Sequence, residues 1–176
     1  TNLVLDGAAA LMLSSETAVG KYPVEAVALM RRVSDRVSES LLGSPETRSG
    51  GSGDSVPHAI GEAIALICQH LEVTKIVAIT ISGYAARMIA AKRPRQSILA
   101  VSNNPEAARR FNLPRGVKGV HVDVSFSRTT MEHIPACLKE LRRLGELVDD
   151  DLVLVTAVGY PQSGNRMNLI ETHRVG

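Results

Sequence analysis

The chain has 176 residues, of which 44% are hydrophobic and 3% are aromatic, and its formal net charge is +2. This length suits one well-packed domain, or a domain with an appendage, with a core built mainly from aliphatic side chains. The small net charge indicates neither nucleic-acid nor membrane binding, and no apolar run reaches the roughly 18 residues of a membrane span. We therefore expect neither of these partners.

Two cysteines, Cys68 and Cys137, both fall within apolar helical patterns. Buried reduced thiols are the simplest interpretation, because neither a disulfide framework nor paired metal ligands are indicated. This cysteine usage predicts a cytoplasmic protein.

The first 42 residues are predicted to form a strand and a helix. The run AAALML, residues 8–13, suits a buried parallel strand. From Pro23, which is typical of a first helical turn, apolar residues recur along one face of a helix that ends near Leu42. The chain starts with Thr1 and not with Met, and its first residues resemble the interior of a longer chain. We therefore expect a fragment of a longer protein.

Residues 43–55 (GSPETRSGGSGDS) contain four glycines, four serines and a proline, and no large apolar residue. Such a composition is typical of a linker. A second region of regular structure is predicted to follow it.

From residue 57 onward, helices alternate with strands. The strands are predicted at residues 75–81, 97–102, 117–124, 151–159 and 167–175. Alternation of this kind indicates βα units and a mainly parallel sheet. The last two strands are joined by YPQSGNR, residues 160–166, which is too short for a helical crossover, so this pair should be antiparallel. The predicted fold class is therefore a three-layer α/β domain with an antiparallel edge strand.

The turn TISGYAAR, residues 80–87, follows the first of these strands and leads into a helix. Ligands of open α/β sheets bind outside the carboxyl ends of strands. The hydroxyls of Thr80 and Ser82, the backbone N–H groups of the turn and the small Gly83 suit a phosphate. The alternative is that Ser82 only caps the helix.

Residues 80–118 are strongly basic, with a single acid, Glu106. The basic residues are Arg87, Lys92, Arg93, Arg95, Arg109, Arg110, Arg115 and Lys118. Near a strand-end turn this charge favours a phosphorylated small molecule or a carboxylate-bearing partner. A nucleic-acid surface is disfavoured, because no aromatic stacking residues are interleaved with the charges.

Three further features carry weaker predictions. Ser163 and Gly164, in the loop of residues 159–166, offer either N–H donors to an anion or only a hairpin connection. The five histidines are scattered without metal-ligand spacing. The run Asp149-Asp150-Asp151 is expected to be a turn with solvated side chains.

Two longer segments carry a family resemblance. LDGAAALMLSSETAVGKYPVEAV, residues 5–27, closely resembles the last barrel strand and following helix of pyruvate kinases. ITISGYAARMIAAKRPRQSILAVSNNPEAARRFNLPRGV, residues 79–117, resembles the C-terminal domain of that family. The resemblance covers almost the whole chain and is thinnest at residues 43–55 and 119–150.

The resemblance implies a domain plan and an activity. Residues 1–42 would be a remnant of a (β/α)₈ catalytic barrel, residues 43–55 a linker, and residues 56–176 the C-terminal effector-binding and assembly domain. The parent enzyme would transfer a phosphoryl group from phosphoenolpyruvate to ADP, using Mg²⁺ and K⁺ held upstream of this chain, so that the fragment alone is inactive and binds no cofactor. Of the family's active-site residues only Ser14 is implied here, in a positioning role; Ser15 replaces a usual glycine beside it.

The resemblance also implies a phosphorylated effector. The residues of this chain at the positions of the family's effector site are Thr80, Ser82, Gly83, Tyr84, Ala85, Ser163 and Gly164. Ile81, Tyr84 and Ala85 depart from the pattern of bisphosphate-activated relatives, the chain has no tryptophan, and Gln162 replaces a glycine. These departures favour a monophosphate effector, or a degenerate site, over a bisphosphate. Family members are generally tetramers, so a homo-oligomer is expected.

Three functional interpretations remain open from the sequence. The first is the effector-binding part of a pyruvate kinase, in contact with the rest of that chain. The second is a free-standing small-molecule-binding or interaction module without catalysis. The third is a catalytically altered relative, which Ser15 and the changed effector turn suggest.

Overall fold

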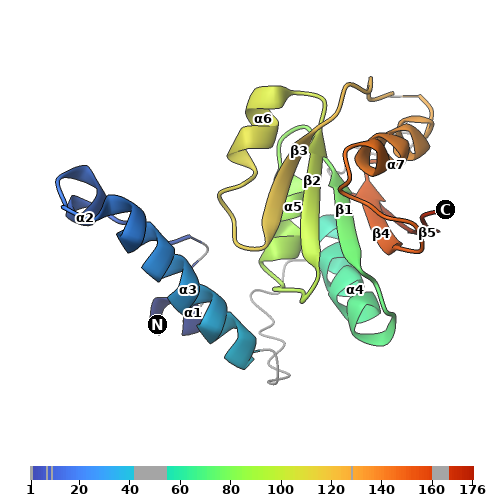
Figure 1. Ribbon diagram of the computed structural model, residues 1–176. Helices are drawn as coiled ribbons and strands as arrows, with labels where there is room; N and C mark the ends of the chain where they lie inside the picture. Colours follow the sequence, from blue (N-terminus) through green and yellow to red (C-terminus); the bar gives the residue numbers. More distant parts are fainter. Residues whose placement is uncertain (1, 7, 9, 42–54, 128, 160–166) are drawn as a thin grey trace. The chain divides into compact units, whose positions relative to one another are not determined.

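The structure, a computed structural model, describes residues 2–6, 8, 10–41, 55–127, 129–159 and 167–176. The chain divides into two compact units, Thr1–Thr47 and Arg48–Gly176. Both units are visible in Figure 1. The linker predicted at residues 43–55 lies almost entirely outside the described residues.

The first unit contains three helices: α1 (Asn2–Leu5), α2 (Ser15–Ala18) and α3 (Pro23–Leu41). As predicted, α3 starts at Pro23, whose missing N–H is not needed in the first turn. The carbonyl of Ser14 accepts hydrogen bonds from the N–H groups of Thr17 and Ala18, at 3.2 and 2.9 Å, and so closes the short α2. This unit is therefore helical throughout its regular segments.

The strand predicted over residues 8–13 is wrong. Residue 8 and residues 10–13 are all described, and none of them lies in a strand. Met12 is 89% exposed, which is the opposite of a buried strand position. A buried parallel strand needs paired neighbours, and the described part of the first unit contains no strand that could supply them.

The second unit is built on a five-stranded sheet. Its strands are β1 (Lys75–Ile79), β2 (Ser97–Ser102), β3 (Val117–His121), β4 (Leu152–Ala157) and β5 (Leu169–Arg174). The spatial order is β3-β2-β1-β4-β5, with β5 antiparallel to β4 and all other pairs parallel. The predicted mainly parallel sheet with an antiparallel last strand is confirmed.

Alternate residues of each strand point to opposite faces, so the sheet has two cores. On one face Val77, Leu99 and Val155 pack with α7 (His133–Arg143). On the other face Ile76 and Ile98 pack with three helices. These helices are α4 (Val56–His70), α5 (Tyr84–Ala90) and α6 (Pro105–Arg110). The result is the predicted three-layer arrangement, which can be followed in Figure 1.

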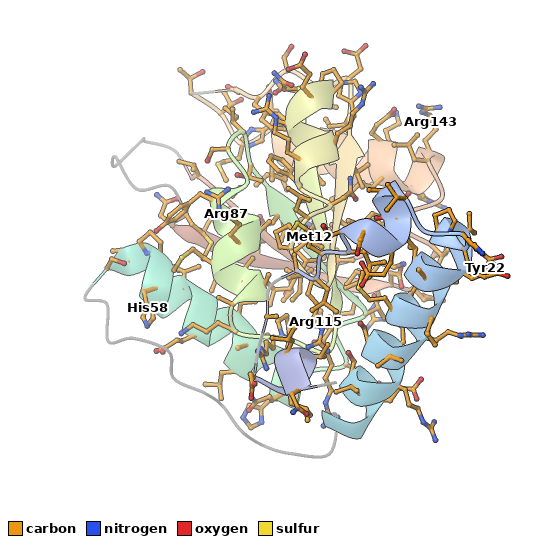
Figure 2. The ribbon with its side chains drawn as sticks, turned by 90° about the vertical axis from the view of Figure 1, so that its left-hand side faces the viewer. Met12, Tyr22, His58, Arg87, Arg115 and Arg143 are labelled. Atoms are coloured by element: carbon orange, nitrogen blue, oxygen red, sulfur yellow. The ribbon has the colours of Figure 1, made fainter. Side chains whose placement is uncertain are left out.

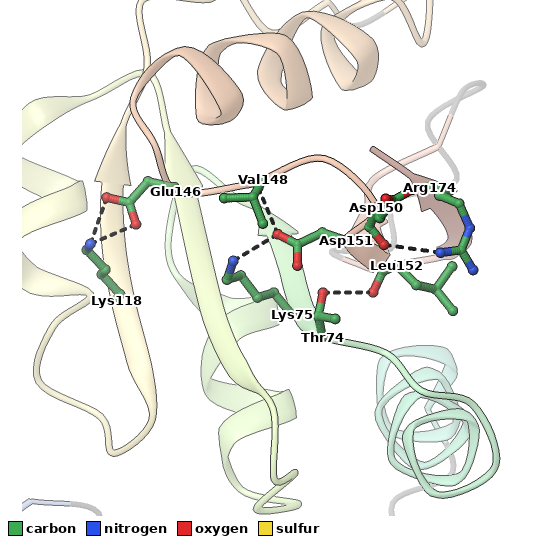
Figure 3. A network of polar contacts seen from close by, with 9 residues as sticks. All are labelled: Thr74, Lys75, Lys118, Glu146, Val148, Asp150, Asp151, Leu152 and Arg174. Carbon is green, nitrogen blue, oxygen red and sulfur yellow. Dashed lines mark hydrogen bonds and ion pairs between the residues drawn. The ribbon is translucent and has the colours of Figure 1, made fainter. Parts of the chain in front are cut away.

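A polar network lies where β4 begins (Figure 3). The Asp151 carboxylate accepts hydrogen bonds from the Lys75 ammonium and from the Val148 N–H, each at 2.9 Å. Asp151 is 7% exposed, so the prediction that all three aspartates of residues 149–151 are solvated is wrong for this one. The reason is that β1 starts beside β4 and brings Lys75 to a carboxylate far away in sequence.

Candidate functional site

A short-range hydrogen bond helps to hold the turn between β1 and α5. The Thr80 hydroxyl, which is buried, accepts a hydrogen bond from the Gly83 N–H at 3.1 Å. Gly83 is the N-cap of α5, and no side chain caps the helix. The alternative in which Ser82 caps this helix is therefore wrong, and the Ser82 side chain stays exposed.

Gly83 brings the turn into direct contact with Phe111, which directly follows α6. Gly83 has φ of 73°, in the left-handed region that favours glycine. A Cβ atom at this position would lie 2.5 Å from Cε1 of the Phe111 ring. The absence of a side chain at residue 83 therefore lets the aromatic ring pack directly under the turn.

A cavity of about 440 Å³ opens beside this turn. From the turn and α5 it is lined by Ile81, Ser82, Gly83, Ala86 and Arg87. From α6, the following loop and β3 it is lined by Ala107, Arg110, Phe111, Leu113, Pro114 and Val117. Its volume is in the range of small-molecule sites.

Among the described residues that line the cavity, two are charged, and both are arginines. Arg87 lies on α5 (Figure 2), and its Nη1 donates a hydrogen bond to the Ser82 carbonyl at 3.2 Å. Arg110 forms an exposed ion pair with Glu106 at 3.4 Å, a contact that contributes little energy in water. Among the described residues that line the cavity there is no carboxylate. The cavity is therefore suited to an anion.

The structure brings only part of the predicted effector site to the cavity. Ser82 and Gly83 line it, whereas Thr80 is buried beneath the turn. Ala85 is buried in the core on the α4–α6 face, and the half-buried Tyr84 is not a lining residue. The predicted Ser163 and Gly164 lie outside the described residues.

The basic stretch of residues 80–118 does not act as one surface. Lys92 is 8% exposed in its side chain and pairs with Glu62 on α4 at 3.2 Å, and this hydrogen bond lowers the pKa of Glu62. Lys118 pairs with Glu146 at 2.7 Å. Arg87 and Arg110 reach the cavity, but the sequence identified them only as members of a charged run.

Phe111 is the functional candidate that the sequence analysis missed. It is the residue immediately after α6, at whose start the Asn104 side chain accepts a hydrogen bond from the Ala107 N–H at 3.0 Å. Phe111 is a large apolar residue that directly follows the run EAARR, residues 106–110. This change in polarity was a signal that the end of α6 is buried. The contact of Phe111 with Gly83 could not be inferred, because it joins two separate βα units.

The predicted positioning residue Ser14 lies in the first unit. Its N–H donates a hydrogen bond to a Glu16 carboxylate oxygen at 3.2 Å, and its carbonyl accepts one from the Thr17 hydroxyl at 3.1 Å. The pKa of Glu16 is lowered by its own backbone N–H and by that of Ser14. These contacts order the turn without involving the Ser14 hydroxyl.

The described residues offer no site for the implied cations. Nowhere in the described part of the chain do three or more histidine, cysteine, aspartate or glutamate side chains gather as a metal site requires. The carboxylates described here therefore form no cluster that fits Mg²⁺. Burial raises the pKa of Cys68 to about 11 and that of Cys137 to about 12, which keeps both as thiols.

No helix in the described ranges is both long and apolar enough to span a bilayer.

The fold and the cavity together define a three-layer α/β domain with an anion-suited pocket next to a strand-end turn. Residues 58–173 of the chain match the model of a protein family that is described as "Pyruvate kinase, alpha/beta domain". The chain therefore belongs to the pyruvate kinase family, as the sequence resemblance predicted.

Several curated relatives match almost the whole chain. Pyruvate kinase 2 of Synechocystis is 36% identical over 157 residues, which cover 89% of this chain and 26% of that protein. Pyruvate kinase of Geobacillus stearothermophilus is 36% identical over 98% of this chain and 29% of its own length. Pyruvate kinase of Agrobacterium vitis is 35% identical over 94% of this chain and 35% of its own length. The chain thus spans about a quarter to a third of these relatives.

Proposed function

We propose that this chain is the C-terminal regulatory part of a pyruvate kinase whose complete chain transfers a phosphoryl group from phosphoenolpyruvate to ADP, giving pyruvate and ATP in glycolysis. Its family membership and its similarity to proteins named pyruvate kinase support this proposal. Ser14 would position substrate, while the groups that hold Mg²⁺ and K⁺ would lie in the remaining two-thirds or more of the enzyme. The chain alone would be inactive, and the whole enzyme would be cytoplasmic.

Residues 1–42 would belong to the catalytic barrel of that enzyme. The first unit leaves many large apolar side chains exposed, which is unusual unless another surface covers them. These are Leu3, Leu5, Met12, Val19, Tyr22, Val24, Val27, Leu29 and Val33. Residues 43–55 would then link this part to an effector-binding and assembly domain, residues 56–176, that contributes to a homo-oligomer.

The second unit would bind a phosphorylated small molecule, with a monophosphate favoured. The cavity beside the β1–α5 turn is the observation that carries this proposal, because Arg87, Arg110 and Ser82 line it and none of the described lining residues has a carboxylate. Guanidinium groups bind phosphate through charge-assisted hydrogen bonds. Thr80 would act indirectly, by holding the turn through Gly83.

A thermal-shift screen of the chain tests the effector site. AMP, ribose 5-phosphate, glucose 6-phosphate and fructose 1,6-bisphosphate are compared, and a ligand at about 100 times its Kd should stabilise the chain by roughly 2.7 kcal/mol. A chain that none of these compounds stabilises would contradict the effector proposal.

Ser82→Ala is expected to lower the affinity for the ligand found in this screen by about tenfold, because a hydrogen bond to a charged group is lost. The matched control is Ser97→Ala, since Ser97 is an exposed serine at the start of β2 and does not line the cavity. Titration calorimetry measures both affinities. Equal affinity of the two variants would place the ligand elsewhere.

A further inference from the structure

Strand β3 lies at one edge of the sheet, where β2 is its only neighbour among the described strands (Figure 1). The N–H and C=O groups on the outer side of an edge strand have no partner within the sheet, so a strand of another molecule can add to them. Whether this edge can associate therefore depends on which of its outer backbone groups remain open.

The hydrogen bonds around β3 show which of its residues face outward. Just before β3, the Gly116 carbonyl accepts a hydrogen bond from the Ile98 N–H of β2 at 2.9 Å. Just after β3, the Val122 N–H donates one to the Ser102 carbonyl of β2 at 3.0 Å. Even-numbered residues thus turn their backbone groups toward β2, and because the groups alternate along the strand, odd-numbered residues turn theirs to the open edge. The residues with an outward N–H group are Val117, Gly119 and His121.

The chain itself fills the first two of these outward donors. The Val117 N–H donates a hydrogen bond to the Pro114 carbonyl at 3.2 Å. The Gly119 N–H, in the middle of β3, donates one to Oδ1 of the Asn112 side chain at 3.0 Å. The third outward donor, the His121 N–H, lies at the carboxyl end of the strand. A strand that added to this edge would therefore lose the donors along most of its length.

The orientation of the Asn112 amide is fixed by its other end. Its Nδ2 donates hydrogen bonds to the Arg109 carbonyl at 3.1 Å and to the Ala108 carbonyl at 3.4 Å. A reversed amide would place its NH₂ group against the Gly119 N–H and its oxygen against two carbonyls, so both ends would lose their hydrogen bonds. The Asn112 oxygen is therefore committed to Gly119.

Two further features of β3 agree with a closed edge. Because Gly119 has no side chain, the backbone of α6 at Ala108 can approach β3 closely, and this approach brings Asn112 to the edge. Lys118 is 58% exposed in its side chain and pairs with Glu146 at 2.7 Å (Figure 3). A charged side chain, lysine above all, is typical of edge strands that are protected from pairing.

We infer that Asn112 is an edge guard: its side-chain oxygen occupies the Gly119 N–H and so keeps β3 from pairing with a strand of a second copy of this chain. The inference does not depend on the proposed effector site or on catalysis. The alternative is that Asn112 only satisfies the last carbonyls of α6. The two roles use opposite ends of one amide, so substitutions can separate them.

Amide hydrogen exchange of the 176-residue chain, followed by NMR, tests the contact itself. Asn112→Ala removes both ends of the amide, whereas Asn112→Asp keeps an acceptor oxygen and loses the Nδ2 donor. We expect the Gly119 amide to exchange at least about tenfold faster in Asn112→Ala, because it loses its acceptor, and to stay within about threefold of the native rate in Asn112→Asp. Circular dichroism checks that both variants are folded.

Sedimentation velocity at a series of protein concentrations tests the guarding role. Asn112→Ala is expected to form an additional, concentration-dependent species that the native chain does not form. The matched control is Asn103→Ala, since Asn103 is an exposed asparagine between β2 and α6 and should leave the sedimentation pattern unchanged.

Each outcome supports or overturns the inference. If Asn112→Ala and Asn112→Asp speed the exchange of the Gly119 amide alike, Asn112 only caps α6. If Asn112→Ala frees this amide but sediments like the native chain, Asn112 does not guard the edge. If the Gly119 amide is unprotected in the native chain, the contact is absent and the inference fails without any variant.

Discussion

Gly119→Ala is expected to lower the free energy of unfolding of the second unit by about 3 kcal/mol, because the new methyl group would enter space that the backbone already occupies. Gly119 lies on β3, and a Cβ atom there would be 1.8 Å from the carbonyl oxygen of Ala108 on α6. Helix α6 must move away to relieve this clash. Urea unfolding followed by circular dichroism measures the effect.

Gly116→Ala is the matched control for this clash. Gly116 immediately precedes β3, and a Cβ atom there would meet nothing within 4 Å, although its φ of +72° makes alanine strained. We expect this variant to cost about 1 kcal/mol from backbone strain alone. Similar costs for the two variants would show that β3 and α6 are not as closely packed as described here.

The second large effect is expected at Asp151. Asp151→Ala should lower the free energy of unfolding by about 2–3 kcal/mol, because it leaves the Lys75 ammonium and the Val148 N–H without this partner. The neighbouring Asp149 pairs with Arg142 at the surface, so Asp149→Ala should cost less than about 1 kcal/mol. Urea unfolding compares the two, and equal costs would contradict the role of the network in Figure 3.

The contribution of Asp151 also depends on pH. Burial alone would raise the pKa of this carboxyl, but the Val148 N–H, the Lys75 ammonium and the Thr74 hydroxyl together lower its pKa below the ordinary value. A lowered pKa means that its stabilising effect is complete above the unfolded-state pKa of about 3.9 and is lost as pH falls through the folded-state pKa. The difference in stability between the native chain and Asp151→Asn should therefore be constant from about pH 6 to 8 and shrink below about pH 4. A difference that grows on acidification would contradict this assignment.

Much of the second unit could be predicted from its sequence because the signals are local. Strand β2 occupies residues 97–102, as the sequence analysis predicted. The antiparallel pairing of β4 and β5 followed from the shortness of residues 160–166. Each of these predictions depends on neighbours along the chain, whose geometry is set by a few dihedral angles.

The errors occurred where a residue's environment comes from distant segments. The run AAALML has the composition of a buried strand, but without a paired strand in its unit the described residues form none. Asp151 reads as a solvated member of an acidic turn, yet its partner Lys75 is 76 residues away in sequence. The composition of a segment cannot show which distant segments of the chain will lie beside it in the folded protein.

The sequence by itself determined the family, the order of the elements and a basic, hydroxyl-bearing turn as the candidate site. Only the tertiary structure decided which groups meet at that turn: Ser82, Arg87 and Arg110 reach the cavity, Thr80 is used inside the turn, and Phe111 supplies an aromatic wall. The physical reason is that the cavity forms between two βα units. Its lining depends on how closely α5 and α6 approach each other, which no local pattern specifies.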